Sequence, residues 1–173
     1  MSIDKYTNNQ IYLDYLHYQI QNGQMYNSHR YFQVTQASSQ DFFLNTGAKD
    51  VHSVFEVSVS GKAVVYLYEG VTINGNTVAA VNPTYNMERA SGNTCLSYCG
   101  YGTGFSTNTE VTLETILLPG GGGPASSAKI GAVARSETEW VLKPSTRYMI
   151  RITNQDTNTI TASMEVEFYE LDV

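Results

Sequence analysis

The segment RYMIRITNQDTNTITASMEVEF, residues 147–168, gives the clearest indication of the fold class of this chain. Apolar side chains occupy every second position from Tyr148 to Ile152 and again from Ile160 to Phe168. Successive side chains of a β-strand point to opposite faces, so this period of two predicts two strands with one apolar face each. The polar residues 153–158 between them predict a turn, and the whole segment is therefore interpreted as a β-hairpin.

The same period of two extends upstream to Arg30 and predicts an all-β fold. Short turns such as Ser60-Gly61 and Ser91-Gly92 separate the apolar runs. Strands are expected near residues 30–36, 52–59, 62–69, 77–84, 93–99, 110–118, 128–134 and 138–142. About eight to ten short strands with frequent turns are typical of a β-sandwich or jelly roll.

Chain length and loop composition indicate one sandwich domain, at residues 28–173. A chain of 173 residues is long enough to bury a single core. The glycine-rich residues 119–127 contain no core-forming side chain and predict an exposed loop inside this domain. The residues after that loop are too few to bury a core of their own.

Residues 1–27 have a different pattern and are expected to form an N-terminal helical or extended arm. Tyr12, Tyr15, Leu16 and Tyr18 recur at mixed steps of three and four, and a glycine at position 23 offers a helix stop. Two interpretations remain open. The arm packs on its own domain, or its aromatic side chains dock on another chain.

The composition is polar but weakly charged. Charged residues make up 15% of the chain, Ser, Thr, Asn and Gly fill 60 of its 173 positions, and the net charge is −6. Nucleic-acid binding needs a cationic face, so we expect no nucleic-acid partner. No apolar run approaches the roughly 20 residues of a membrane span, and the N-terminus lacks an apolar leader. We therefore expect no membrane partner and synthesis in a cytoplasm.

Carboxylate pairs and the glycine loop give no strong signal for catalysis. The loop lacks the Gly-Lys-Ser/Thr ending of a phosphate-binding P-loop. Glu137 with Glu139, and Glu165 with Glu167, would lie about 7 Å apart on one strand face, a separation that two-carboxylate chemistry can use. An outward strand face carries such pairs routinely, so a glycan hydrolase is the weaker interpretation. We expect no enzymatic activity, no catalytic residue and no cofactor.

Cysteines and histidines show no metal-binding pattern. Cys95 and Cys99 are the only cysteines, and on an extended strand their Cα atoms would be about 13 Å apart, beyond disulfide reach unless a turn intervenes. His17, His29 and His52 lack paired-ligand spacing and any nucleophile motif. We expect two reduced, half-buried thiols and no metal.

Two stretches are candidates for binding. The strand at residues 63–68 is apolar on both faces, so its second face lies either under the arm or against a neighbouring subunit. In the second case Val64, Tyr66 and Tyr68, or else Val65 and Leu67, pack between subunits. Three tyrosines in the Gly- and Asn-rich residues 82–109 form a candidate contact surface: Tyr85, Tyr98 and Tyr101.

The order of several short motifs resembles a family of small virion proteins of tailed bacteriophages, the capsid decoration, or cement and head-surface, proteins. These motifs occur in sequence at residues 52–57, 63–72, 81–89, 120–123, 142–148 and 168–170. The resemblance covers about residues 50–171 in matching order. Two departures are Asn86-Met87-Glu88-Arg89 where the family has Asn-x-Asn-Arg, and Phe168 where it has tryptophan.

The resemblance implies a non-enzymatic structural protein on the virion capsid surface, made in the host cytoplasm. Its implied partners are the major capsid protein and, as a homotrimer, two further copies of itself. We expect Asn86 and Arg89 to contact the capsid or a neighbouring protomer, although Arg89 could instead pair with Glu88 or a residue near Glu69. The alternative function is a carbohydrate-binding or host-surface-binding head fibre that uses Tyr85, Tyr98, Tyr101 and Trp140 as stacking platforms.

Overall fold

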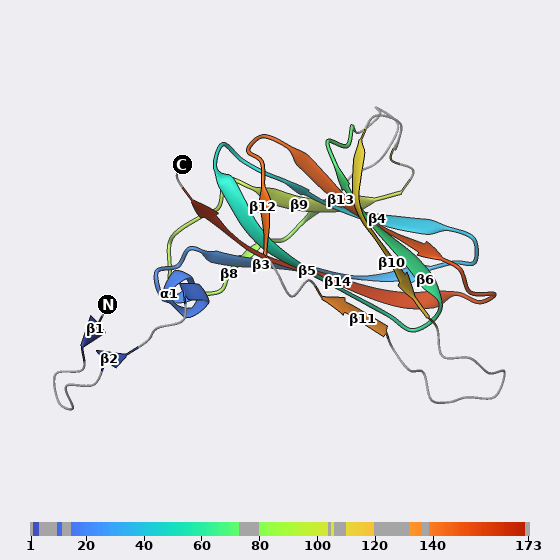
Figure 1. Ribbon diagram of the computed structural model, residues 1–173, viewed down its shortest axis with the longest axis horizontal. Coiled ribbons are helices and arrows are strands. Elements are labelled where there is room, and N and C mark those ends of the chain that lie inside the picture. The colour runs from blue at the N-terminus through green and yellow to red at the C-terminus, as the bar shows by residue number, and fades with distance from the viewer. Residues whose placement is uncertain are drawn as a thin grey trace.

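A computed structural model describes residues 2–3, 10–11, 15–72, 80–103, 105, 110–119, 132–135 and 139–171. Two antiparallel sheets face each other across an apolar core, and Figure 1 shows them as two layers. The predicted all-β sandwich is therefore confirmed. The predicted glycine loop at 120–123, Tyr12 and Glu137 lie outside the described residues.

The first layer, called the β6 sheet, has the strand order β10-β6-β13-β4-β9-β7. Its strands are β10 (Val111–Leu118), β6 (Ala63–Glu69), β13 (Arg147–Asn154), β4 (Ser39–Asn45), β9 (Tyr98–Gly102) and β7 (Ala80–Asn82). The second layer, called the β14 sheet, has the order β11-β5-β14-β3-β8, with β12 also paired to β5. Its strands are β11 (Ala132–Arg135), β5 (Asp50–Val59), β14 (Ile160–Leu171), β3 (Met25–Val34), β8 (Tyr85–Asn86) and β12 (Trp140–Leu142).

The N-terminal part contains three short elements outside both sheets. These are β1 (Ser2–Ile3), β2 (Gln10–Ile11) and α1 (Tyr15–Gln21). The helix ends just before Gly23, whose φ of 64° is a left-handed conformation that glycine adopts at little cost, as the helix-stop prediction required. Strand β3 begins at Met25, so the sandwich starts three residues before the predicted boundary at residue 28.

Both strands predicted in residues 147–168 are present, but the predicted hairpin between them is wrong. Strand β13 pairs with β4 and β6, whereas β14 pairs with β3 and β5 in the other sheet. Asn154 shapes the corner, since its side-chain amide donates to the carbonyls of Val34 and Asn158 at 2.8 and 2.7 Å. Alternation shows that a strand has one apolar face, but it does not show which strand it pairs with.

An interior strand of the β6 sheet was not predicted from the sequence. Strand β4 carries the run Phe42-Phe43-Leu44, in which all three side chains are buried. Phe42 and Leu44 belong to the main core between the sheets, and Phe43 belongs to a second cluster on the outer face. Burial on both faces removes the alternation by which a strand is recognised.

Other predicted strands differ mainly in their ends. The strand expected near 30–36 runs from Met25 to Val34, and the one expected at 93–99 is β9, at Tyr98–Gly102. The expected strand at 77–84 is described only as β7, followed by the short β8. Loops of asparagine, glycine and serine around these strands make their bounds hard to place from composition.

The side chains of Tyr148, Glu69 and Lys143 join two strands to a turn. The Tyr148 hydroxyl donates to Glu69 Oε2 at 2.8 Å and accepts from the Lys143 backbone amide at 2.9 Å. Lys143 Nζ lies 2.7 Å from Glu69 Oε1. Hydrogen bonds from Lys143 and Tyr148 hold the pKa of Glu69 below its ordinary value of 4.5.

A depressed carboxylate pKa makes this contribution to stability dependent on pH. It is complete above pH 4.5 and is lost as the pH falls through the lower pKa of folded Glu69. We expect Glu69→Gln to lower stability at pH 7 by about 1 kcal/mol or less, because Lys143 is exposed and the pair is screened. Thermal unfolding of both proteins from pH 7 to pH 3 should show the difference shrinking, and a constant difference would contradict the assignment.

Candidate interaction surfaces

Strand β6 directs one apolar face into the core and the other outward. Ala63, Val65 and Leu67 are buried between the sheets, so the prediction that Val65 and Leu67 pack between subunits is wrong. Val64, Tyr66 and Tyr68 are half-buried on the opposite side. The rings of Tyr66 and Tyr68 stack with their centroids 5.7 Å apart. Next to Val64 in register lies Leu117 of β10, which is 61% exposed.

A second apolar cluster covers the neighbouring part of that outer face. Phe43 and Met149 lie side by side on β4 and β13, and Val71 and Phe105 from two loops cover them. Beside them Arg151 forms a two-bond ion pair with the buried carboxylate of Asp41, at 2.7 and 2.9 Å. Arg151 also donates to the Phe105 carbonyl at 2.8 Å, which ties the loop to the sheet.

The helix of the arm lies against the other sheet. Helix α1 contacts β3, and Figure 1 shows it at one end of the sandwich, away from β6. Thus α1 does not supply the predicted cover for the outer face of β6. Leu16 is half-buried and Tyr18 is 51% exposed, while the side chain of Tyr15 is not described. The helix therefore packs on its own domain and keeps Tyr18 at the surface.

Asn86 and Arg89 occupy different kinds of position. Asn86 holds loops together, because its Nδ2 donates to the carbonyls of Gly23 and Asn93 and its Oδ1 accepts from the Glu88 amide. Arg89 is exposed, donates to the Asn86 carbonyl at 3.4 Å and lies 5.6 Å from the centre of the Tyr85 ring. Asn86 thus has a structural role, and Arg89 remains at the surface beside Tyr85.

The predicted tyrosine contact surface is not one surface. Tyr85 lies on β8 at the edge of the β14 sheet, whereas Tyr98 and Tyr101 lie on β9 of the β6 sheet. Tyr101 packs against the main core under the guanidinium of Arg30, and Trp140 also packs on that core. The four aromatic residues expected to form stacking platforms therefore do not form a shared row. Strand pairing separates residues that are close in sequence.

The described members of the two predicted carboxylate pairs lie on the outer face of the β14 sheet. Glu139 Oε2 accepts from the Tyr169 hydroxyl at 2.9 Å and lies 3.1 Å from His52 Nδ1, on the outer face of the β14 sheet. Glu165 and Glu167 also point outward, and Glu165 accepts a hydrogen bond from Asn27. In the described ranges, no group of His, Cys, Asp and Glu is suited to hold a metal.

Both cysteines are free thiols in protected positions. Cys95 is half-buried and its Sγ donates to the Ser97 carbonyl at 3.1 Å, while Cys99 is fully buried. Burial raises the pKa of Cys95 to about 11 and that of Cys99 to about 12. Both groups therefore stay protonated at neutral pH and are poor nucleophiles.

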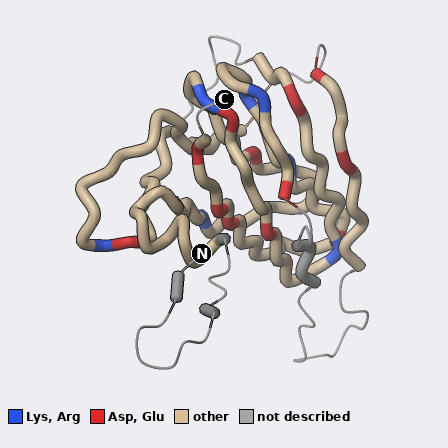
Figure 2. The backbone as a smooth tube through the Cα atoms, turned by 60° about the vertical axis from the view of Figure 1, so that its left-hand side comes forward, with Lys and Arg blue, Asp and Glu red and all other residues tan. Residues whose placement is uncertain are grey.

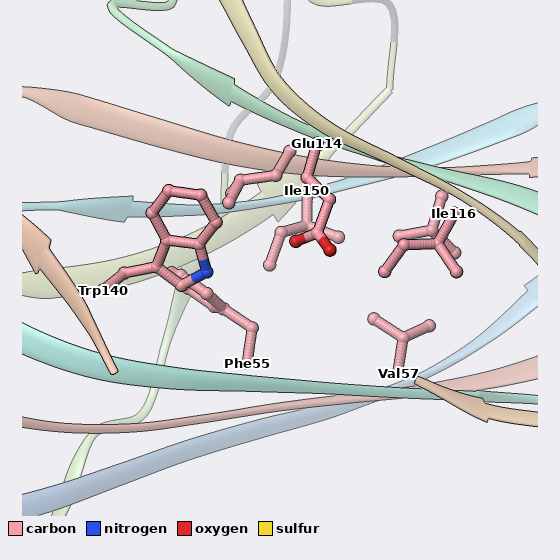
Figure 3. A pocket seen from close by; sticks show the side chains of 8 residues that line it. Phe55, Val57, Glu114, Ile116, Trp140 and Ile150 are labelled. Carbon is pink, nitrogen blue, oxygen red and sulfur yellow. The ribbon is translucent and has the colours of Figure 1, made fainter. Parts of the chain in front are cut away.

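An apolar pocket opens between the sheets beside Trp140, as Figure 3 shows. Its walls include Phe55, Val57 and Ile116, with the side chain of Glu114 at the rim. The space inside is only about 30 Å³, enough for a water molecule or two. It is an imperfectly filled margin of the core and too small for a sugar or a cofactor.

A larger polar hollow lies at one end of the β6 sheet, with a volume of about 520 Å³. Arg147 on β13, Asn45 on β4 and Tyr98 on β9 form a row in it, because Asn45 is the register partner of both others. Of these three residues, only Tyr98 was predicted from the sequence to lie on a contact surface. Arg147 occupies a polar position beside the alternating residues 148–152, and Asn45 lies on β4, which was not predicted.

The comparisons with known proteins name no relative. A scan against models of protein families matches none, and a search of curated proteins finds none similar to this chain. No helix in the described part of the chain is long and apolar enough to cross a membrane. Figure 2 shows the charged residues scattered over the backbone, without a basic strip in the described part.

Proposed function

We propose that this chain is a structural virion protein that decorates and stabilises a bacteriophage capsid by binding the major capsid protein. In this proposal it is a non-enzymatic homotrimer on the capsid surface, and neither nucleic acid nor a membrane is a partner. The order of motifs from residue 52 to residue 170 supports this function. The observation that carries it is the outward apolar face of β6 and β10.

This face consists of Val64, Tyr66, Tyr68 and Leu117. Contiguous apolar patches on soluble proteins commonly mark contact sites, and aromatic residues are enriched there. Each Å² of apolar surface removed from water contributes about 25 cal/mol, so a neighbouring protomer is stabilised by covering the strip. A closed trimer repeats each capsid contact three times, which converts weak single contacts into firm attachment.

Leu117→Asp is expected to convert the trimer into a folded monomer and to weaken capsid attachment. The substitution places a charge in the apolar strip, while the exposure of Leu117 keeps its effect on folding small. Light scattering at micromolar concentration should give three times the 19.1 kDa chain mass for the unchanged protein. Co-sedimentation with heads built from the major capsid protein of the same phage measures attachment.

Val141→Asp is the matched control, since Val141 is 60% exposed on β12 of the opposite sheet. It should leave mass and co-sedimentation unchanged. A monomeric unchanged protein that stays in the supernatant would overturn the function. A Leu117→Asp protein that remains trimeric would instead move the interface away from β6.

A further inference from the structure

The polar hollow at the end of the β6 sheet has features of a ligand site outside the proposed capsid contact. Its central row is Arg147, Asn45 and Tyr98, on three neighbouring strands and on one face. The turn at Ser145 and the loop at Gly70 line its sides. A volume of about 520 Å³ lies within the range of small-molecule sites, about 300 to 1,000 Å³.

Arg147 brings a positive charge to the hollow without a described carboxylate to neutralise it. Its Nε donates to Asn45 Oδ1 at 2.6 Å and its Nη1 to the Val71 carbonyl at 3.4 Å, both neutral acceptors. By contrast, Arg151 is paired with Asp41 and Lys143 with Glu69. A guanidinium with donors to spare is well suited to a planar carboxylate.

Asn45 supplies a second, independent feature. Asn45 is only 9% exposed, and its Oδ1 already accepts a hydrogen bond from Arg147. Its Nδ2 has no hydrogen-bond acceptor among the described residues. A buried donor without an acceptor costs about 1 to 3 kcal/mol, so a ligand oxygen that Nδ2 reaches after a small shift of the Asn45 side chain would be favoured.

Tyr98 offers a fixed apolar platform next to these polar groups. Its ring is 47% exposed and meets Phe43 edge-to-face with the centroids 6.4 Å apart, which holds the ring in place. The face of an aromatic ring can pack against the C–H face of a sugar, while hydroxyl groups bind polar neighbours. Ser145 is held at a φ of 49°, a strained conformation of the kind that occurs at ligand sites.

We infer that this hollow binds an acidic sugar of a surface glycan, with the carboxylate at Arg147 and the sugar ring on Tyr98. A simple anion would bind Arg147 without contacting Tyr98. A neutral sugar would offer no negative charge to the guanidinium of Arg147. The hollow lies at the Glu69 end of β6, whereas Leu117 pairs with Val64 at the other end. The strip reaches the border of the hollow at Tyr68, but Leu117→Asp lies at the far end and tests the trimer contact without changing the hollow.

Titration of the full chain followed by amide NMR shifts tests the inference. N-Acetylneuraminic acid and glucuronic acid are the acidic probes, glucose and N-acetylglucosamine the neutral ones, and acetate the bare carboxylate. We expect one acidic sugar to bind with a Kd of about 1 mM and to shift the amides around Asn45 and Tyr98. Arg147→Gln should weaken binding at least about tenfold, and Tyr98→Ala about fivefold.

Two variants on other surfaces serve as controls. Arg89→Gln removes an exposed arginine beside a tyrosine, and Tyr31→Ala removes a tyrosine that is 61% exposed on the β14 sheet. Both should bind like the unchanged protein. Tyr98→Ala keeps the test valid if Arg147→Gln unfolds. Equal binding of neutral sugars or acetate, equal loss in the control variants, or no shift at about 20 mM of either acidic sugar would each overturn the inference.

Discussion

Asp41→Asn is expected to destabilise the domain by about 3 kcal/mol. The substitution removes the charge opposite Arg151 but keeps the shape of the side chain. Hydrogen bonding to Asp41 raises the pKa of Arg151 in the unchanged protein. In the variant that support is lost, but a guanidinium is too basic to lose its proton near neutral pH, so the charge stays. The Arg151 guanidinium would remain largely buried without an opposite charge. Leaving this charge unpaired lowers the stability of the fold by more than the intact ion pair adds to it. Urea unfolding monitored by tryptophan fluorescence measures the loss.

Two comparisons separate this effect from ordinary damage. Lys143→Ala breaks an ion pair whose lysine is 69% exposed, and it should cost less than about 1 kcal/mol. The double variant Asp41→Leu with Arg151→Met removes both charges and should lose less than Asp41→Asn alone, because no unpaired charge stays buried. A cost for Asp41→Asn no larger than that for Lys143→Ala would contradict a buried, coupled pair.

Gly100→Ala should be nearly as destabilising, by about 2 to 3 kcal/mol. A Cβ at Gly100 would lie 2.2 Å from Cζ of Phe43, far inside van der Waals contact. The ring cannot move aside easily, since it is 3% exposed and packed against Phe105 at a centroid distance of 5.7 Å. Glycine at this position of β9 therefore leaves room for the tip of the Phe43 ring beside the strand. Thermal and urea unfolding both measure the effect.

Gly92→Ala is the matched control, because a Cβ there meets no atom within 4 Å. It should change stability by less than about 0.5 kcal/mol. Shortening the ring with Phe43→Leu should make Gly100→Ala less costly in the double variant than in the single one. Two results would contradict the proposed contact between the Phe43 ring and β9. One is an equally small loss of stability in Gly92→Ala and Gly100→Ala. The other is a loss in the double variant equal to the sum of the losses in Phe43→Leu and Gly100→Ala.

Much of the sandwich follows from local alternation in the sequence. The strands β5, β6, β10, β13 and β14 were predicted within about three residues, because each has one face in the core and the other outside. Strand β4 was missed for the opposite reason, since Phe43 is buried on the outer face as well. The predicted hairpin between β13 and β14 failed because strand pairing depends on contacts that alternation does not record.

The candidate surfaces were less predictable than the fold. The sequence indicated two apolar faces on residues 63–68, but only the packing shows that Val64, Tyr66 and Tyr68 are the outward ones. The row in the hollow combines Asn45, Tyr98 and Arg147, which lie about fifty residues apart along the chain. No spacing rule connects such residues, because antiparallel pairing between distant strands brings them together.

Local sequence patterns were enough to establish the class of this protein: a weakly charged, all-β domain with alternating strands and a helix stop at Gly23. These features follow from the side-chain period of a strand and the backbone freedom of glycine, both of which are local. The tertiary structure decided which strands pair, which face of β6 remains outside, and which polar groups meet at Arg147. Those outcomes depend on burial and register between distant segments, so they arise only when the two sheets close on a common core.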